Sequence, residues 1–164
     1  MIRLSVETEA DWHEVESLFD LTFAPGREAL SSYRLRDGVA PVADLCLVAR
    51  DDTYNTLAGA IRHWPVTLGS ARAPGLLLGP IAVHPTHQGE GLGRRLINGA
   101  LTRAAGLGYS RVILIGDGPY YNRFGFMRCE DLAFPPPTNP DRLLCRALTP
   151  GAFDGITGPV RRAP

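Results

Sequence analysis

Cysteine is scarce in this sequence, and the few cysteines present have none of the spacings typical of metal sites. Cys46, Cys129 and Cys145 form no C-x-x-C motif, and three cysteines cannot all pair with one another. This usage argues against a structural zinc site and favours a reducing compartment. We therefore expect a cytoplasmic protein that needs no metal.

Long apolar runs and an excess of charge of one sign are also missing. No apolar segment approaches the roughly 20 residues that span a bilayer, and residues 1–16 carry early acidic residues, unlike a secretory signal. The 17 basic and 17 acidic residues give a formal net charge of zero, with no basic stripe that would bind nucleic acid. We expect neither a membrane nor a nucleic acid to be a partner.

The length and composition suit one domain. A chain of 164 residues, of which 45% are apolar, is long enough to bury a core, and we find no internal repeat. We expect a single domain over residues 1–164. Residues 150–164 are rich in glycine and proline, and the sequence leaves open whether they cover an edge of the fold or are partly disordered.

One glycine-rich stretch, residues 88–95, organises the rest of the chain. It follows an apolar run, residues 76–83, and opens an amphipathic segment, residues 92–107, so it reads as strand, turn and helix. Backbone N–H groups and the helix dipole at such a helix start attract anions. The guanidinium groups of Arg94 and Arg95 can add charge-assisted hydrogen bonds to phosphate. The stretch therefore predicts a phosphorylated ligand.

Two common phosphate-binding motifs do not fit this stretch. The dinucleotide fingerprint G-x-G-x-x-G would need a glycine at position 94 or 96, where the chain has Arg94 and Leu96. The P-loop would need a Gly-Lys-Ser/Thr triplet, which does not occur. The spacing that is present is Q-x-x-G-x-G, formed by Gln88, Gly91 and Gly93.

The pattern of apolar residues along the rest of the chain predicts a mixed α/β fold. Alternating or apolar runs predict strands at residues 2–6, 44–50, 57–64, 76–83, 111–115, 126–129 and 143–147. Pro80 cannot donate to a sheet ladder, so it predicts a bulge in the central strand. That strand, the helix after the glycine turn and residues 111–115 form one βαβ unit. A short helix through Phe124 is expected after Pro119.

Two helices are expected near the amino terminus. The first starts at Thr8, with Asp11 in the place of the capping-box acid, and is broken by Pro25-Gly26; a second covers residues 27–36. The apolar face of the first helix is expected to contain Trp12, Val15, Leu18, Phe19 and Phe23.

The motif around Gln88, together with residues 81–85, resembles the acyl-CoA-binding motif of the GNAT superfamily of N-acetyltransferases. Residues 120–126, with an aromatic pair followed by Gly-Phe, resemble the second signature of that family. The two motifs cover residues 76–128 and are most similar to a small bacterial subgroup of predicted N-acetyltransferases. The resemblance implies a mixed central sheet of about seven strands, flanked by helices, with the central strand splayed from its neighbour.

The resemblance also implies the ligand and the reaction. The cosubstrate is expected to be acetyl-CoA, and the acetyl group is expected to pass directly to a primary amine of a small molecule or a peptide. A homodimer is compatible with such folds. The residues expected to bind the cosubstrate are Ile81, Ala82, Val83, Gln88, Gly89, Glu90, Gly91, Leu92, Gly93 and Arg94.

Tyr121 matches the family tyrosine expected to act as general acid, because a phenol can protonate a departing thiolate. Tyr120 is the less suitable acid. Asp117 follows a strand close to the expected thioester, so it is a candidate general base, although it could equally cap the next helix. His63, His84 and Glu28 are other candidates, and a proton relayed by water is as plausible, so the base remains unassigned.

Two rival functions and one rival route remain open. A non-catalytic acyl-CoA sensor of the same fold is compatible with the lack of carboxylates on the central strands. A nucleotide-binding module of another kind is weaker, because the fingerprints above fail. An acyl-cysteine route through Cys129 or Cys145 lacks a neighbouring His or Asn, and free cysteines are more often buried apolar groups.

Overall fold

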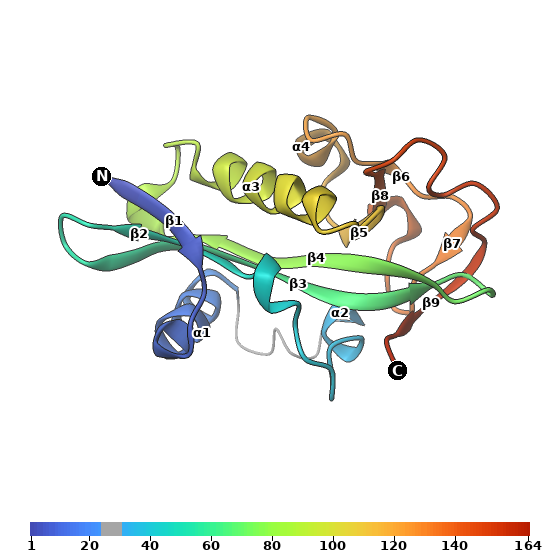
Figure 1. The fold of residues 1–164 in the computed structure, drawn as a ribbon, viewed down its shortest axis with the longest axis horizontal. Coiled ribbons are helices and arrows are strands. Elements are labelled where there is room, and N and C mark those ends of the chain that lie inside the picture. Colours follow the sequence, from blue (N-terminus) through green and yellow to red (C-terminus); the bar gives the residue numbers. More distant parts are fainter. Residues whose placement is uncertain (24–30) are drawn as a thin grey trace.

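A mixed β-sheet crosses the molecule and carries helices on both faces (Figure 1). The computed structural model describes residues 1–23 and 31–164. In chain order the elements are β1 (Ile2–Val6), η1 (Glu9–Asp11), α1 (Trp12–Thr22), α2 (Ser31–Arg34), η3 (Ala43–Leu45), β2 (Leu47–Asp51), β3 (Thr56–Leu68), β4 (Ala73–Val83), η4 (Pro85–His87), α3 (Leu92–Gly106), β5 (Arg111–Ile115), α4 (Gly118–Asn122), β6 (Met127–Arg128), β7 (Leu132–Ala133), η5 (Pro140–Arg142), β8 (Leu143–Ala147) and β9 (Gly158–Arg162).

The main path of the sheet contains the seven strands expected, in the order β1-β2-β3-β4-β5-β8-β6. Neighbours on this path are antiparallel except β4 and β5, which are parallel. The parallel pair and α3 between them form the expected βαβ unit. Two further strands, β9 and β7, lie off the path, and β9 pairs with the end of β3 at residues 66–68.

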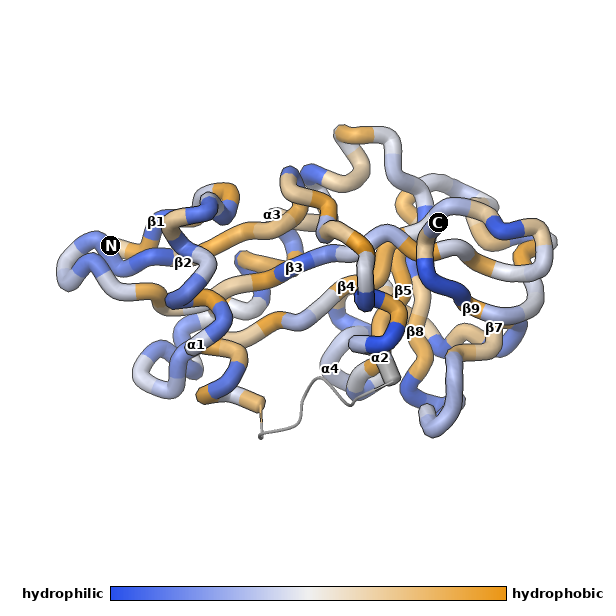
Figure 2. Tube along the Cα trace, turned by 90° about the horizontal axis from the view of Figure 1, so that it is seen from below, coloured by the Kyte–Doolittle hydropathy of each residue, from blue (hydrophilic) through white to orange (hydrophobic). Residues whose placement is uncertain are grey.

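Helices α3 and α4 cover one face of the sheet, and α1 and α2 cover the other (Figure 1). On the α3 face, Leu96 and Ile97 pack in a buried cluster with Leu76 and Leu78 of β4. Leu77 lies in a separate buried cluster, so β4 is covered on both faces. This double cover explains the nearly continuous apolar run of β4, and the hydropathy-coloured trace shows apolar stretches along the central strands (Figure 2).

The bulge expected at Pro80 is present. Ile61 of β3 pairs with Ile81 of β4, but His63 pairs with Leu78, so β4 has one extra residue between these pairs. The bulge bends β4 at the point where it leaves β5, which creates the space for the site described below.

Three boundaries differ from the sequence-based expectation. Asp44 and Leu45 belong to the 3-10 turn η3 instead of a strand, although Leu45 still faces the core. Strand β3 continues past Trp64 to Leu68 because its end pairs with both β4 and β9. The helix expected over residues 27–36 is described only as α2; Pro25, Gly26 and Glu28 lie outside the described residues.

Trp12 was expected on the buried face of the first helix, and this was wrong. Its residue surface is 49% exposed, whereas Val15, Leu18 and Phe19 are buried. Trp12 is the first residue of α1, and helical side chains lean towards the amino-terminal end. Its ring packs edge-on against His13, with 5.1 Å between the centroids, and borders a hollow that Arg62 and Trp64 of β3 also line.

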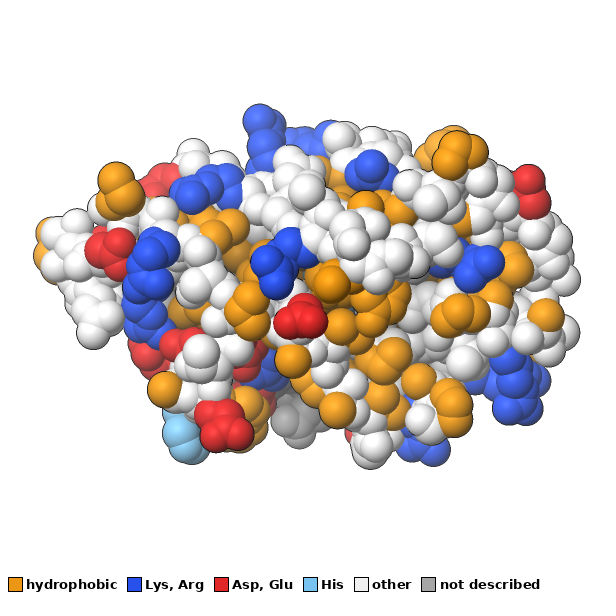
Figure 3. All heavy atoms as spheres, in the orientation of Figure 1, with side chains coloured by type: hydrophobic (Ala, Val, Ile, Leu, Met, Phe, Trp, Pro, Cys, Tyr) orange, Lys and Arg blue, Asp and Glu red, His pale blue; other side chains and the backbone are white. Residues whose placement is uncertain are grey.

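The carboxy-terminal segment, residues 150–164, contributes β9 to the sheet. Val160 of β9 is buried against Val66 and Leu68 of β3. No helix within the described ranges is long and apolar enough to cross a membrane. Basic and acidic side chains are interspersed on the face seen in Figure 3, as the zero net charge suggests.

Candidate functional site

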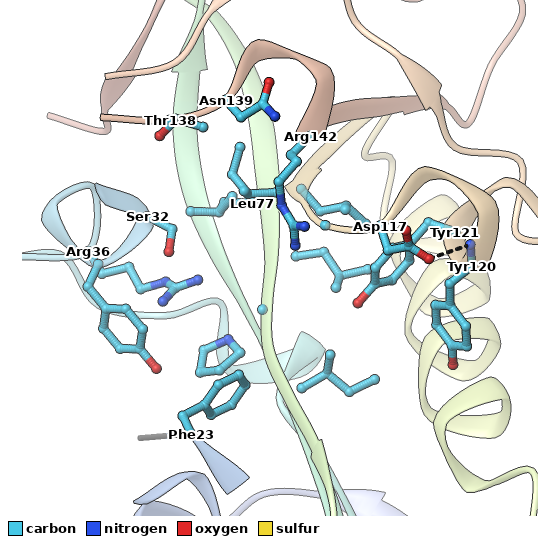
Figure 4. A pocket seen from close by; sticks show the side chains of 18 of the residues that line it. Phe23, Ser32, Arg36, Leu77, Asp117, Tyr120, Tyr121, Thr138, Asn139 and Arg142 are labelled. Atoms are coloured by element: carbon cyan, nitrogen blue, oxygen red, sulfur yellow. Dashed lines mark hydrogen bonds between the residues drawn. The ribbon is translucent and has the colours of Figure 1, made fainter. Parts of the chain in front are cut away.

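The site lies where β4 and β5 part. The two strands pair only at Leu76 with Val112 and at Leu77 with Ile113. Beyond these pairs a cavity of about 740 Å³ opens, and both strands line it (Figure 4). Its walls include Tyr33, from the segment that contains α2 on one face of the sheet, and residues of α4 on the other. The cavity therefore reaches through the gap from one side of the sheet to the other.

The glycine turn forms a second hollow, of about 420 Å³, at the start of α3. Gly89 and Gly91 have positive φ angles of 83° and 76°, and a Cβ added to either would find open space. Glycine is therefore favoured there by backbone conformation, and its small size leaves room for a ligand beside the backbone. Gln88 ties the turn to β4 because its Nε2 donates to the Val83 carbonyl oxygen at 3.4 Å.

Most of the residues expected to bind the cosubstrate meet in these two hollows. The smaller one is lined by Val83, Gln88, Gly89, Gly91, Leu92, Gly93 and Arg94, and the larger one by Ile81. The side chain of Ala82 packs on the opposite face of the sheet, with α1, and that of Glu90 faces His87 at 3.1 Å. Ala82 and Glu90 can therefore contact a cosubstrate in these hollows only through their main-chain atoms.

Arg95 does not lie beside the anion site as the sequence suggested. Its Nη2 donates to the Ile2 carbonyl oxygen at 3.4 Å, on the edge strand β1. Successive residues of a helix point about 100° apart, which separates Arg95 from Arg94. Arg123 supplies a basic group at the hollow instead, with its guanidinium 4.8 Å from the centre of the Tyr120 ring.

Helix α4 positions the two tyrosines of the second motif. Asp117 caps this helix, with its Oδ2 accepting the Tyr120 N–H at 3.2 Å. Tyr120 lines both hollows, so they are neighbours. A Cβ at position 93 would lie 3.1 Å from the Tyr120 hydroxyl oxygen, so Gly93 lets α4 approach α3 closely.

Tyr121 points into the larger cavity (Figure 4). Its ring stands at 90° to that of Tyr120, with 4.9 Å between the centroids, and also contacts Phe126. Gly116 admits this ring, because a Cβ there would lie 2.5 Å from a Tyr121 ring carbon. Burial raises the pKa of Tyr121 to about 12, so the phenol keeps its proton at neutral pH.

The candidate bases lie in different environments. Asp117 is the only carboxylate among the described residues that line the larger cavity. His63 is buried under η3, with Nδ1 2.9 Å from the Leu45 carbonyl oxygen, and does not line the cavity. His84 accepts the Thr86 N–H and lines a different hollow. Glu28 lies outside the described residues.

Burial lowers the pKa of His63 to about 4, from 6.5. The unfolded chain then binds more protons than the folded one between these values, so the free energy of unfolding should fall as pH drops below 6.5. We expect a loss on the order of 2–3 kcal/mol by about pH 4.5. Urea unfolding at a series of pH values measures it. His63→Gln should abolish this loss of unfolding free energy at low pH, and His84→Gln should retain it. Equal pH dependence in all three proteins would contradict the attribution of the loss to His63.

Neither cysteine near the end of the sheet reaches the cavity. Cys129 is buried and Cys145 is half-buried on β8, and neither lines the site. The hydrogen bond with Cys145, together with burial, raises the pKa of the Cys129 thiol. The same hydrogen bond lowers the pKa of Cys145, but because neither sulfur lines the cavity, neither could attack an acyl group there. Within residues 1–23 and 31–164, no group of three His, Cys, Asp or Glu side chains could hold a metal ion.

Sequence reasoning missed the polar residues on the far walls of the larger cavity. Arg36 follows α2, Asn139 precedes η5, and Arg142 is the last residue of η5. No motif marks these residues, and their segments are separated by about 100 residues of chain. A proline cluster such as the one before Asn139 is typical of a stiff loop, but it does not indicate which surface the loop faces.

The comparisons with known proteins agree with this geometry. Residues 12–126 match the model of the acetyltransferase (GNAT) family. The chain is 29% identical over 160 residues to the uncharacterized N-acetyltransferase YhbS of Escherichia coli, covering 96% of this chain and 93% of YhbS.

Two crystal structures also resemble the chain closely. YhbS from E. coli in complex with CoA has a TM-score of 0.84 at 28% identity, covering 99% of this chain and 89% of that one. A GNAT family acetyltransferase from Brucella melitensis in complex with acetyl-CoA has a TM-score of 0.75 at 30% identity, covering 99% and 96%.

Proposed function

We propose that this chain, which belongs to the GNAT family of acetyltransferases, transfers the acetyl group of acetyl-CoA directly to a primary amine. The observation that carries this proposal is that the hollow at the glycine turn and the cavity in the gap between β4 and β5 lie on either side of one shared lining residue, Tyr120. The relatives from E. coli and B. melitensis, whose structures contain CoA and acetyl-CoA, support it.

The residues of the smaller hollow suit a pyrophosphate. Backbone N–H groups of residues 89–94 at the start of the 15-residue helix α3 would bind it, and Arg94 and Arg123 would add charge-assisted hydrogen bonds. The main chain of residues 81–83 would hold the pantetheine amides. The His84 N–H donates to Ala58 of β3, so the preceding N–H, of Val83, points to the opposite edge and faces the gap. It would donate to the thioester oxygen.

Tyr121 and Asp117 would handle the protons. As the amine forms its bond to the carbonyl carbon and the carbon–sulfur bond breaks, Tyr121 would donate its phenolic proton to sulfur. The Asp117 Oδ2 is used in the helix cap, so Oδ1, directly or through water, would accept the proton released by the amine. Burial raises the pKa of Tyr121 because it disfavours the charged phenolate. It would raise the pKa of the CoA thiol bound beside Tyr121 in the same way, so the transfer of a proton from the phenol to the thiolate would remain favourable.

We propose that residues 1–164 act as one domain in the cytoplasm and that the acceptor is an amine of a small molecule or a peptide. A homodimer is compatible with this function but is not needed for it, because every residue invoked above belongs to one chain.

Thermal unfolding with acetyl-CoA tests the ligand, with ATP and NAD as controls. At 100 times its dissociation constant, acetyl-CoA should add about 2.7 kcal/mol to the free energy of unfolding, which raises Tm by several degrees. Gly91→Val should lose most of this shift, because its Cβ stands beside the turn and its φ is unfavourable. Gly106→Ala, at the far end of α3, should keep it. A shift with a nucleotide alone would contradict the proposal.

Release of free thiol in the presence of a panel of amines tests the reaction. All 17 basic residues of the chain are arginines, so the protein contains no lysine that could act as an acceptor and raise the background. Binding of acetyl-CoA without thiol release from any amine would favour the alternative, a non-catalytic acyl-CoA sensor of the same fold.

A further inference from the structure

We propose that the acceptor amine also carries a carboxylate, bound by Arg142 with Arg36 facing it, so that the substrate is an amino acid or a similar amino carboxylate. This inference rests on the proposed function and names the class of its acceptor. It starts from the charges around the larger cavity. The charged side chains among its described lining residues are Arg36, Arg142 and Asp117.

The two arginines enter the cavity from opposite walls. In Figure 4 the guanidinium groups of Arg36 and Arg142 both point towards the space beside β4, with Leu77 between their elements. Guanidinium groups on two walls favour a negatively charged ligand group, such as a carboxylate, in the space between them.

Arg142 has its donors available for a ligand. Among the described residues no carboxylate or carbonyl pairs with its side chain, although an acidic residue, Asp141, is its neighbour. Asp141 pairs instead with Arg128, with 2.8 Å between Nη2 and Oδ1. Asn139 caps η5 through its Oδ1, which accepts the Asp141 N–H at 3.0 Å, and so fixes the turn that carries Arg142. A guanidinium presents its donors in a fork that matches a carboxylate.

Arg36 is buried on the other wall, where it stacks on aromatic rings. It is only 7% exposed, and its guanidinium carbon lies 4.3 Å from the centre of the Tyr33 ring and 5.9 Å from that of Trp64. A Cβ at Gly79 would lie 3.4 Å from the Arg36 Nη2, so the guanidinium comes close to the β4 bulge. Stacking on aromatic rings orients such a group at little further entropic cost.

The cavity is therefore polarised along its length. Asp117 and Tyr121 lie on the side of β5 and α4, and Arg36 lies on the side of α2 (Figure 4). An amino carboxylate placed with its ammonium group towards Asp117 and its carboxylate towards the arginines satisfies both ends. That orientation directs the amine to the gap in the sheet, where the thioester is expected.

Matched acceptors test this inference. With acetyl-CoA, kcat/KM should be about 10- to 100-fold higher for amino acids than for the same compounds as amides, because a charge-assisted contact is lost in the amide. Arg142→Gln should remove this preference by raising KM for the amino acid. Arg161→Gln, on the distant strand β9, should retain it. An aminoalkyl phosphate that is preferred over the carboxylate would overturn the choice of anion.

Equilibrium binding separates this inference from the proposed function. With CoA bound, calorimetric titration should give a lower dissociation constant for the amino acid than for its amide, and Arg142→Gln should make the two equal. Equal binding of both compounds by the natural chain would overturn the inference, even if neutral amines are acetylated. A preference for the carboxylate without turnover on any amine would support the inference and contradict the proposed reaction.

Discussion

Replacing Tyr121 with phenylalanine is expected to lower kcat by about 10²- to 10⁴-fold, the usual contribution of a positioned proton donor. The substitution removes only the hydroxyl group. The ring contacts with Tyr120 and Phe126 remain, so the fold and the binding of acetyl-CoA should be preserved. Steady-state kinetics together with the acetyl-CoA shift in Tm measure both quantities.

The pH dependence sharpens this prediction. Because the pKa of Tyr121 is raised to about 12, the phenol stays protonated throughout the range in which the reaction can be assayed. Deprotonation of Tyr121 should therefore not lower the kcat of the natural chain between pH 8 and pH 10. Any fall in kcat over that range should be seen equally in Tyr121→Phe. The loss in kcat should be constant across that range.

Two neighbouring variants provide the controls. Tyr120→Phe removes the hydroxyl group that faces Gly93, and kcat should change by less than about tenfold if Tyr120 is not the acid. Asp117→Asn keeps a side-chain oxygen that can cap α4 but loses a carboxylate that can accept a proton. If kcat is unchanged in Tyr121→Phe, Tyr121 is not the general acid.

Replacing Arg62 with methionine is expected to cost about 3–5 kcal/mol of unfolding free energy. Arg62 lies on β3 and is 7% exposed. Its Nε and Nη2 contact the Glu7 carboxylate at 3.1 and 2.9 Å, and its Nη1 contacts Glu16 of α1 at 2.5 Å. The substitution removes the cation and leaves the Glu7 carboxylate, which is only 10% exposed, without this partner.

An exposed ion pair provides the matched control for Arg62. Arg3 pairs with Asp52 at 3.2 Å, but both side chains are about half exposed, so Arg3→Met should cost less than about 1 kcal/mol. Urea unfolding of the three proteins gives the free energies. Equal losses in both variants would mean that burial does not strengthen the Arg62 network. A large loss in Arg62→Met alone would show that this network holds α1 against the sheet.

The family motifs and the local patterns carried most of the correct expectations. The glycine turn, the span of α3 and the bulge at Pro80 depend on neighbouring residues, through backbone conformation, helix periodicity and a missing N–H. The strand β4 could be recognised as covered on both faces because its apolar residues are nearly continuous. These features are readable from the sequence because their causes lie within a few residues of one another.

The errors fall where distant segments meet. The exposure of Trp12 depends on how α1 packs against the sheet, and the end of β3 pairs not only with β4 but also with β9, almost 100 residues later. Arg95 looked like a phosphate ligand until its contact with Ile2 of β1 was known. None of these partners is adjacent in sequence, so no local pattern could have indicated them.

By itself, the sequence determined the family, the βαβ unit and the position of the glycine turn, because backbone geometry and hydrophobic periodicity are encoded locally. Only the tertiary structure decided which side chains line the larger cavity. Arg36 and Arg142 are ordinary arginines in segments without a motif, and the fold brings them to opposite walls of one space. Long-range packing sets that arrangement, and no local pattern along the chain indicates it.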